Sequence, residues 1–363
     1  MRLGRTRLLL PLLVVAAFSF AQHRNPQLAG RIDRIMQARS ATGEFNGSVL
    51  VARRGQIIYQ RGFGLANIEW NIPNDVDTRF EIGSMTKQFT AMLILQMVSQ
   101  GKISLHGHVS EYLPYYRKDT GARVTISELL SHTSGIPNFT DIPGFFDGPA
   151  SRTTYGVREF VEKYCSGNLR FDPGTRFEYS NSGYFLLGAI LQQVSGQAYE
   201  KLLQQRIFMP LEMKNSGYTH SQVVLPHRAS GYERSQSGLK NARYYDMSIP
   251  FAAGALYSTV GDLYLWDRAL YGERLLPAPL RDLLFKPNLE NYGYGWVMLV
   301  PKPGAPYAGE SIPMHGGAIF GFTSVIQRIP KHEELIILLD NNESPKLLEI
   351  ALQLRTALAE SPQ

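Results

Sequence analysis

The sequence has 363 residues, of which 44% are hydrophobic and 19% charged, a composition typical of a globular protein with one large core or two modest ones. Its formal net charge is +6, and because three arginines lie in the first 21 residues, the remaining chain carries +3. So small an excess, without a dense basic block, excludes a typical nucleic-acid-binding protein. The single cysteine, Cys165, excludes an internal disulfide, and we expect it to be a small buried residue.

The first 21 residues have the pattern of a secretory signal peptide. Three arginines precede an apolar run over residues 8–18, and Ser19 and Ala21 provide the small residues of a cleavage site. Cleavage after Ala21 predicts a periplasmic or secreted protein with no stable membrane span. An uncleaved anchor is the alternative, but the apolar run is too short to cross a bilayer comfortably.

Hydrophobic periodicity predicts strands near both ends of the chain and helices between them. An amphipathic helix begins near Leu28, and a C-terminal helix begins at Leu347. Polar loops over 135–154 and 230–247 interrupt the middle of the chain, and loops of that length are typical of lids or rims. The predicted strands are Ser48–Ala52, Ile57–Tyr59, Tyr294–Val300, Phe322–Ile329 and Leu335–Leu339, and the predicted middle helices are Val124–Ser131, Tyr184–Val194 and Thr259–Leu270.

This order of elements predicts an α/β (α+β) fold. One central antiparallel sheet would be built from both chain ends and flanked by helices, with a mostly helical region inserted between them. We expect residues 22–363 to form a single domain. Its α/β part would comprise about 22–83 and 290–363, and its mostly helical part about 103–289.

The most informative stretch is Phe80–Phe89, in which Ser84 and Lys87 are three residues apart at the start of a predicted helix. This spacing puts both side chains on one side of the first turn. A serine hydroxyl becomes a nucleophile when a neighbour takes its proton, and a lysine with a lowered pKa can do so. The alternative is a serine that caps the helix beside a solvated lysine.

Two further motifs lie downstream. Tyr179-Ser180-Asn181 immediately precedes a predicted helix, and His315-Gly316-Gly317-Ala318 is expected to precede a strand. Together with Ser84 and Lys87 they resemble, in order and wide spacing, the three motifs of the penicillin-recognising serine hydrolases. That family includes class C β-lactamases, D-alanyl-D-alanine carboxypeptidases and β-lactamase-like esterases. The resemblance runs from about Gly47 to Asp340, through the stretches Leu129–Pro137, Gly254–Leu263 and Tyr292–Trp296.

The resemblance implies a β-lactamase/transpeptidase-like fold and a single catalytic domain that needs neither a cofactor nor a metal. Ser84 would form an acyl-enzyme, Lys87 would take its proton, and Tyr179 would share that task and protonate the leaving group. The backbone N–H groups of Ser84 and Ala318 would form the oxyanion hole. The substrate would be bound by Asn181, His315, Gly316 and Gly317. Asn181 would orient either the substrate or the Lys87 side chain.

Two expectations concern charge in this site. A cationic lysine and a tyrosine in one desolvated pocket are expected to lower each other's pKa. Classical members of the family have lysine where this chain has His315, and that lysine pairs with the substrate carboxylate. Because histidine is neutral over much of the range above its usual pKa of about 6.5, esters and amides without a free carboxylate become more plausible substrates.

The substrate class stays open between esters, β-lactams and D-amino-acid peptides, since the shared motifs drive acyl transfer and the loops select the leaving group. A sensor or binding module that acylates without turnover is the alternative to an enzyme. An α/β-hydrolase is disfavoured because no Gly-x-Ser-x-Gly elbow occurs. His132 is best explained as a structural residue at a helix end, and His106 and His108 are too few for a metal site. Aromatic residues expected near the cleft, where they would suit an apolar acyl group, are Tyr115, Tyr116, Phe145, Phe146, Tyr244, Tyr245, Tyr292, Tyr294, Trp296 and Phe320.

Overall fold

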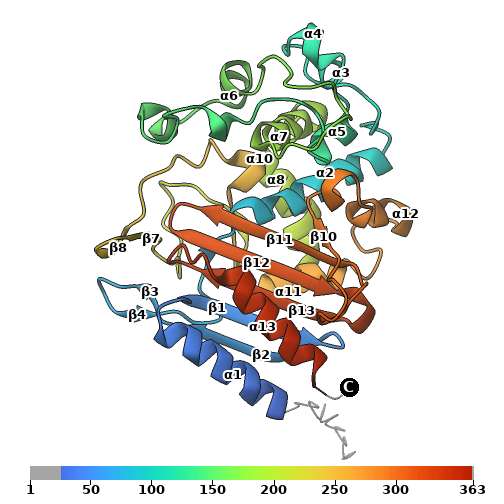
Figure 1. Cartoon of the computed structure of the whole chain (residues 1–363). Helices are drawn as coiled ribbons and strands as arrows, with labels where there is room; N and C mark the ends of the chain where they lie inside the picture. The colour runs from blue at the N-terminus through green and yellow to red at the C-terminus, as the bar shows by residue number, and fades with distance from the viewer. Residues whose placement is uncertain (1–25, 362–363) are drawn as a thin grey trace, which may run out of the picture.

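The computed structural model describes residues 26–361, so the predicted signal peptide lies outside the described residues. A six-stranded antiparallel sheet has the order β10-β11-β12-β13-β1-β2. Its strand β1 pairs with β13, with Gly47 opposite Asp340, so the two ends of the chain meet in the middle of the sheet (Figure 1). The predicted central antiparallel sheet is therefore confirmed. The strands are β1 (Gly47–Arg53), β2 (Gln56–Phe63), β10 (Val297–Leu299), β11 (Ile312–Ile319), β12 (Phe322–Ile329) and β13 (Glu334–Asp340).

Both faces of the sheet are covered, which explains the uninterrupted apolar run of β13. Alternate residues point to opposite faces of a strand. Ile336 and Leu338 join a core beneath α1 (Pro26–Ala41) and α13 (Leu347–Ala359), which lie on one face. Ile337 and Leu339 join the larger core on the other face, beneath α11 (Val260–Ala269) and the helical region.

One strand differs from the sequence-based expectation. The segment His315–Ala318 was expected to precede a strand, but it lies inside β11 and pairs with β12 from Met314 opposite Gln327 onward. Two adjacent glycines have low strand propensity, and this hid the strand. Strand β10 is also shorter than the predicted Tyr294–Val300, because Gly295, with φ 75°, turns the chain before it.

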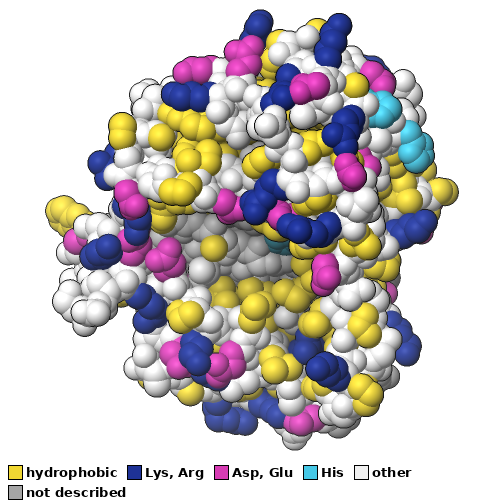
Figure 2. Space-filling view, turned by 45° about the horizontal axis from the view of Figure 1, so that its top comes forward, with side chains coloured by type: hydrophobic (Ala, Val, Ile, Leu, Met, Phe, Trp, Pro, Cys, Tyr) yellow, Lys and Arg dark blue, Asp and Glu magenta, His cyan; other side chains and the backbone are white. Residues whose placement is uncertain are grey.

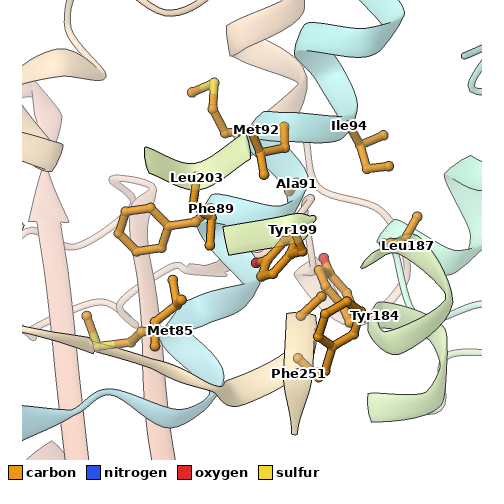
Figure 3. Packing of buried hydrophobic residues seen from close by; sticks show 14 of the residues in the cluster. Met85, Phe89, Ala91, Met92, Ile94, Tyr184, Leu187, Tyr199, Leu203 and Phe251 are labelled. Atoms are coloured by element: carbon orange, nitrogen blue, oxygen red, sulfur yellow. The ribbon is translucent and has the colours of Figure 1, made fainter. Parts of the chain in front are cut away.

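The segment of the chain between β2 and β10 contains most of the helices and packs around α2 (Thr86–Ser99). All but two residues of α2 are buried, and Figure 3 shows Phe89 and Met92 of this helix among side chains from α7, α8 and α10. Such a helix is apolar all round because it lies inside the protein. The other helices are α3 (Val109–Tyr112), α4 (Lys118–Gly121), α5 (Ile126–Leu130), α6 (Val157–Tyr164), α7 (Asn181–Ser195), α8 (Tyr199–Leu203), α9 (Met209–Leu211), α10 (Phe251–Gly254), α11 (Val260–Ala269) and α12 (Ala278–Arg281).

Short elements complete the described fold. Strand β9 (Leu256–Ser258) joins β5 (Phe80–Glu81) and β6 (Gly217–Tyr218) in a small sheet next to η1 (Gly83–Met85), a single turn of 3₁₀ helix. The remaining pairs are β3 (Leu65–Asn67) with β4 (Ile72–Pro73), and β7 (Tyr232–Ser235) with β8 (Gly238–Asn241). The remaining short helices are η2 (Phe139–Asp141), η3 (Pro149–Arg152), η4 (Gln204–Phe208), η5 (Asp282–Phe285), η6 (Leu289–Asn291) and η7 (Pro330–His332).

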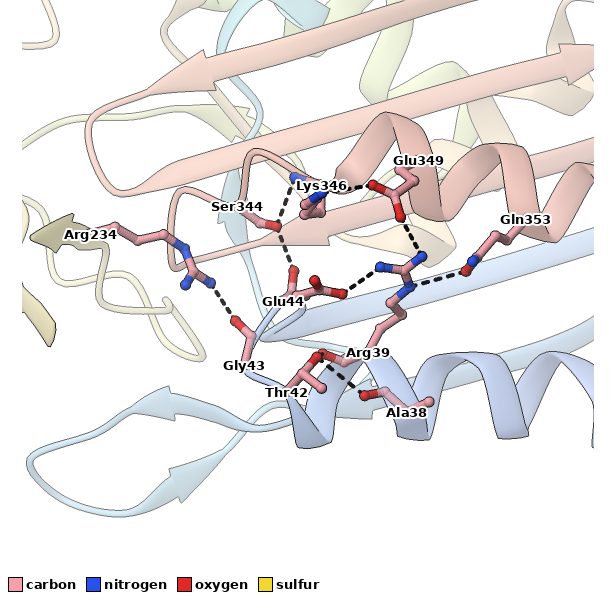
Figure 4. A network of polar contacts seen from close by, with 10 residues as sticks. All are labelled: Ala38, Arg39, Thr42, Gly43, Glu44, Arg234, Ser344, Lys346, Glu349 and Gln353. Carbon is pink, nitrogen blue, oxygen red and sulfur yellow. Dashed lines mark hydrogen bonds and ion pairs between the residues drawn. The ribbon is translucent and has the colours of Figure 1, made fainter.

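Helices α1 and α13 are joined by a polar cluster centred on Arg39. Its guanidinium contacts Glu44 at 2.5 Å, Glu349 at 2.6 Å and the Gln353 side chain at 3.0 Å (Figure 4). These contacts connect the first helix to the last across the outer face of the sheet. None of the helices among residues 26–361 is long and apolar enough to span a membrane.

Candidate active site

Ser84 lies in η1, where the chain passes from the small sheet into α2. The turn depends on Gly83, whose φ is 50°, and a Cβ at Gly83 would lie 2.8 Å from the backbone nitrogen of Ala318. A Cβ at Gly317 would lie 2.0 Å from the carbonyl oxygen of Ile82. Glycine at both positions therefore lets β11 approach the backbone of the serine turn, which brings the Ala318 amide next to Ser84.

Lys87 occupies the first turn of α2 and its side chain is fully buried. Its Nζ lies 3.1 Å from Ser84 Oγ, 2.8 Å from Asn181 Oδ1 and 2.9 Å from the carbonyl oxygen of Ala253. Burial holds the pKa of Lys87 well below its ordinary value of 10.5. A neutral amine has two N–H groups, which suit the two carbonyl-type acceptors. Its lone pair is then free to accept the proton of the Ser84 hydroxyl.

Tyr179 lies beside both of these residues. The Lys87 nitrogen is 4.7 Å from the centre of the Tyr179 ring, and the phenol hydrogen-bonds with the Ser84 side chain. The expectation of a lowered tyrosine pKa is wrong. Burial raises the pKa of Tyr179 above 10.0, and the bond to Ser84 only partly opposes this. Since the buried lysine is not a fixed cation, little positive charge is present to stabilise a phenolate.

His132 packs against Tyr179 and has the structural role that was expected from the sequence. Its ring lies 4.2 Å, centre to centre, from the ring of Tyr179. The Nδ1 atom accepts a 3.0 Å bond from the backbone N–H of Ser180, and burial holds the pKa of His132 well below 6.5. His132 lies just after the end of α5, as predicted, and its backbone φ there is 58°. An uncharged His132 thus fixes the backbone that carries the Tyr179 motif.

Asn181 is the first residue of α7, which begins three residues before the predicted start at Tyr184. The Ser180 hydroxyl caps this helix by accepting a 3.2 Å bond from the N–H of Gly183. Asn181 itself accepts the bond from Lys87, and its backbone N–H donates to Asn138 Oδ1 at 3.0 Å. The asparagine therefore holds Lys87 in place.

His315 is buried in β11 and is uncharged at neutral pH. Its Nδ1 donates to the carbonyl oxygen of Gly316 at 2.6 Å, which leaves Nε2 to accept from the Tyr292 hydroxyl at 3.0 Å. Burial, with a smaller contribution from Lys87, lowers the pKa of His315 to about 4. His315 was expected to change its charge near pH 6.5, but burial lowers its pKa to about 4.

A cavity of about 220 Å³ opens at Ser84. It is lined by Asn181 and Ala318, and the space-filling view shows the molecule hollowed between its helical part and the sheet (Figure 2). Of the aromatic residues expected near the cleft, Phe146, Tyr245 and Phe320 line this cavity. Others fill the core, where Tyr116 and Trp296 are buried.

No group of three or more metal-ligating side chains occurs within residues 26–361. His108, considered as a possible ligand, has its Nδ1 atom 2.8 Å from a carboxylate oxygen of Glu111. The buried Cys165 matches its expected place, and burial raises its thiol pKa.

The chain matches the family model for Beta-lactamase over residues 32–359. The chain belongs to the β-lactamase family. It is 29% identical over 299 residues to the putative penicillin-binding protein PbpX of Bacillus subtilis (strain 168), covering 82% of this chain and 71% of that protein. It is 28% identical over 330 residues to penicillin-binding protein 4* of the same strain, covering 85% of this chain and 71% of that protein.

Solved structures agree with this membership. D-amino acid amidase from Ochrobactrum anthropi SV3, complexed with D-phenylalanine, has a TM-score of 0.80 at 25% identity, covering 93% of this chain and 100% of that chain. A penicillin-binding protein from Bacillus halodurans has a TM-score of 0.76 at 27% identity, covering 91% and 99%. The predicted β-lactamase/transpeptidase-like fold and the family resemblance are confirmed.

In this member of the β-lactamase family, the candidate active-site pocket has few charges. Burial favours the neutral forms of Lys87, His132, Tyr179 and His315 at neutral pH. Glu343, which sequence reasoning missed, is the only charged side chain that lines the cavity within the described part of the chain. A single glutamate in a loop after β13 belongs to no motif, so nothing in the sequence alone distinguished it.

Proposed function

We propose that this protein is an exported serine hydrolase that cleaves ester or amide bonds through an acyl-enzyme on Ser84. The proposal is carried by one observation, the 3.1 Å contact between Ser84 Oγ and a fully buried lysine nitrogen. Burial disfavours the ammonium form, so the nitrogen is available as a base near neutral pH. Membership of the β-lactamase family supports the same chemistry.

In acylation, the Ser84 hydroxyl transfers its proton to Lys87 as Oγ forms a bond to the substrate carbonyl carbon. The carbonyl oxygen takes the displaced electron pair, and the backbone N–H groups of Ser84 and Ala318 stabilise the resulting oxyanion. When the bond to the leaving group breaks, the neutral Tyr179 phenol donates its proton to the departing atom. The Lys87 ammonium then returns a proton to Tyr179, which restores both side chains.

In deacylation, a water molecule attacks the acyl carbon from the position that the leaving group has vacated. The water gives a proton to the pair formed by Lys87 and Tyr179. The bond from the acyl carbon to Ser84 Oγ breaks, and the serine recovers its proton. Asn181 keeps Lys87 oriented in both half-reactions through their 2.8 Å bond. Gly316 and Gly317 keep the β11 backbone close to the substrate, where His315 acts as a neutral hydrogen-bonding group.

The substrates that this pocket suits are small esters or amides without a free carboxylate. His315 is neutral at pH 7, since its pKa is about 4, so it does not supply a cation for a carboxylate. The cavity of about 220 Å³ fits a small acyl group, as it is below the range of about 300–1,000 Å³ common for drug-sized ligands. β-Lactams and D-amino-acid peptides are the less favoured alternatives.

Purified protein and its Ser84→Ala variant are to be assayed in parallel against a short-chain aryl ester, a chromogenic cephalosporin and a D-alanyl-D-alanine peptide. We expect the aryl ester to be turned over fastest, and every activity to be absent from the variant while its circular dichroism is unchanged. Equal activity in both proteins would contradict the proposal. A persistent adduct on Ser84 without turnover would instead identify a sensor that acylates once.

A further inference from the structure

The catalytic cavity contains an acidic side chain that the acyl-transfer chemistry does not use. Glu343 lies in the loop between β13 and α13 and is partly buried against the cavity that opens at Ser84. Its backbone φ is 51°, in the left-handed region that glutamate seldom adopts. The Asp340 carboxylate holds this geometry, since its Oδ1 accepts from the backbone N–H of Asn342 at 2.9 Å and of Ser344 at 3.1 Å. Glu343 is therefore fixed from both sides.

The carboxylate of Glu343 has no ion-pair partner within residues 26–361. The nearby cations are engaged elsewhere, because Arg243 contacts Glu233 at 3.0 Å and Lys240 contacts the same carboxylate at 3.1 Å. The Glu343 carboxylate instead interacts with the backbone of Gly321 through a hydrogen bond. Burial and the charge of Glu233 raise the pKa of Glu343, while Arg243 and Lys240 attract its carboxylate without forming an ion pair with it. The acidic side chain thus lines a cavity that opens at Ser84, with no cation of the described residues in contact.

Three aromatic rings line the same cavity as this carboxylate and form what we call the aromatic cluster, namely Phe146, Tyr245 and Phe320. Phe320 contacts both of the others edge to face, with ring centres 5.3 Å from Phe146 and 5.4 Å from Tyr245. All three line the cavity together with Glu343. The Arg243 guanidinium lies over the Phe320 ring, 4.6 Å from its centre, so Phe146 and Tyr245 are the rings available to a ligand cation. A carboxylate and aromatic rings in one cavity can bind an organic ammonium ion by charge and by cation–π attraction.

We propose that Glu343 and the aromatic cluster form a subsite for a substrate ammonium group, so that the enzyme prefers acyl donors that carry a protonated amine. This inference rests on the proposed function for its substrate class. A site that recognises a substrate carboxylate would need a cation at this place, where the cavity has the acidic side chain of Glu343. The ammonium group sits at Glu343 while the carbonyl carbon lies at Ser84, so the amine belongs to the same small molecule as the scissile bond.

Binding of benzylammonium, with benzyl alcohol as its neutral counterpart, tests the subsite without turnover. Calorimetric titrations are to be made on the wild-type protein, on Glu343→Gln and on Glu212→Gln. Glu212 is a matched control, because it is also left-handed, with φ 59°, but is exposed and outside the cavity. We expect the wild-type protein and Glu212→Gln to bind benzylammonium at least tenfold more tightly than the alcohol, and Glu343→Gln to lose that preference.

Kinetics give a second readout. For an aryl ester with a free amine and its N-acetyl analogue, Glu343→Gln is expected to lower kcat/KM for the first at least tenfold more than for the second, mainly through KM. Equal binding of benzylammonium and benzyl alcohol to the wild-type protein, or an unchanged preference in Glu343→Gln, would overturn the subsite. Failure to hydrolyse any ester, with benzylammonium binding intact, would instead contradict the proposed function alone.

Discussion

Burial lowers the pKa of the Lys87 amine and so disfavours its charged form. The amine is surrounded by hydrogen-bond acceptors and by the Ser84 hydroxyl that it is proposed to activate. Its 2.8 Å and 2.9 Å contacts with Asn181 and Ala253 occupy the two N–H groups of the neutral form. In the proposed mechanism, the base therefore arises from desolvation of an amine rather than from a carboxylate or a histidine. Both nearby histidines, His132 and His315, have lowered pKa values of their own.

The pH dependence of kcat/KM follows from this base. Because the pKa of Lys87 is lowered well below 10.5, its reactive neutral form is populated at a lower pH than in an ordinary lysine. With an uncharged aryl ester, we expect kcat/KM to rise by much less than tenfold per pH unit between about pH 7 and 9. A lysine with an ordinary pKa would make the rate rise about tenfold per pH unit over that interval. Steady-state rates across that interval separate the two cases.

Protein stability should also depend on His315. Its folded pKa is about 4 and its usual value is 6.5, so the unfolded chain binds more protons between these values. The stability that neutral His315 provides is present above pH 6.5 and is lost as the pH falls toward 4. Between pH 7 and 5 we expect the wild-type protein to lose about 2 kcal/mol more unfolding free energy than His315→Gln. Urea titrations at both pH values measure the difference, and equal losses in the two proteins would contradict it.

At the scale of elements, the site depends on the close approach of β11 to η1. The approach is possible because Gly317 has no side chain, and Ser324 of β12 donates a 2.9 Å bond to the carbonyl oxygen of Ile82 at the same point. The strand that carries Ala318 and the turn that carries Ser84 are thereby held together. The oxyanion hole is proposed to form between them.

Adding one methyl group tests this contact. In Gly317→Ala the Cβ would lie 2.0 Å from the Ile82 carbonyl oxygen, whereas in Gly316→Ala the nearest atom would be 3.6 Å away. We expect Gly317→Ala to reduce kcat at least about 100-fold, the size of effect seen when an oxyanion donor is removed. Gly316→Ala should retain far more activity and stability. Similar kcat values for the two variants would show that the approach of β11 is not needed.

Sequence reasoning worked for elements with a strong pattern. β12 has the predicted bounds, and the short helix predicted over Val124–Ser131 is present as α5. It failed at β11, where Gly317 is needed for a tertiary contact that propensity does not encode. Among the candidate site residues, Ser84 and Lys87 were suggested by their spacing and selected through the resemblance of the three motifs to the family. The raised pKa of Tyr179 could not be predicted, because it depends on burial.

At the scale of the whole molecule, the helical region and the sheet share a buried ion pair. Arg328 of β12 contacts Asp267 of α11 at 2.5 Å, and both side chains are only 2% exposed. Burial raises the pKa of Asp267, and the attraction of Arg328 opposes this. The pair joins the sheet to a helix of the larger core.

Removing one partner should be more harmful than removing both. Arg328→Met leaves a buried carboxylate without its cation, and we expect it to lower the unfolding free energy by about 3–5 kcal/mol. The double variant Arg328→Met with Asp267→Leu should recover much of that loss. The exposed pair Arg31 and Glu360 is the control, and Arg31→Met should cost less than about 1 kcal/mol. Chemical denaturation of the wild-type protein and the three variants provides the comparison, and a double variant less stable than Arg328→Met would contradict the expectation.

The central claim is that Ser84 is the nucleophile and that the buried amine of Lys87 activates it. Intact-mass spectrometry within the first turnover of an aryl ester, followed by peptide mapping, tests it most directly. We predict an acyl adduct on the peptide that contains Ser84, no adduct in Ser84→Ala, and acylation slowed at least about 1,000-fold in Lys87→Ala, as expected for loss of a general base. An adduct that forms at the wild-type rate in Lys87→Ala, or on any other residue, would contradict the account.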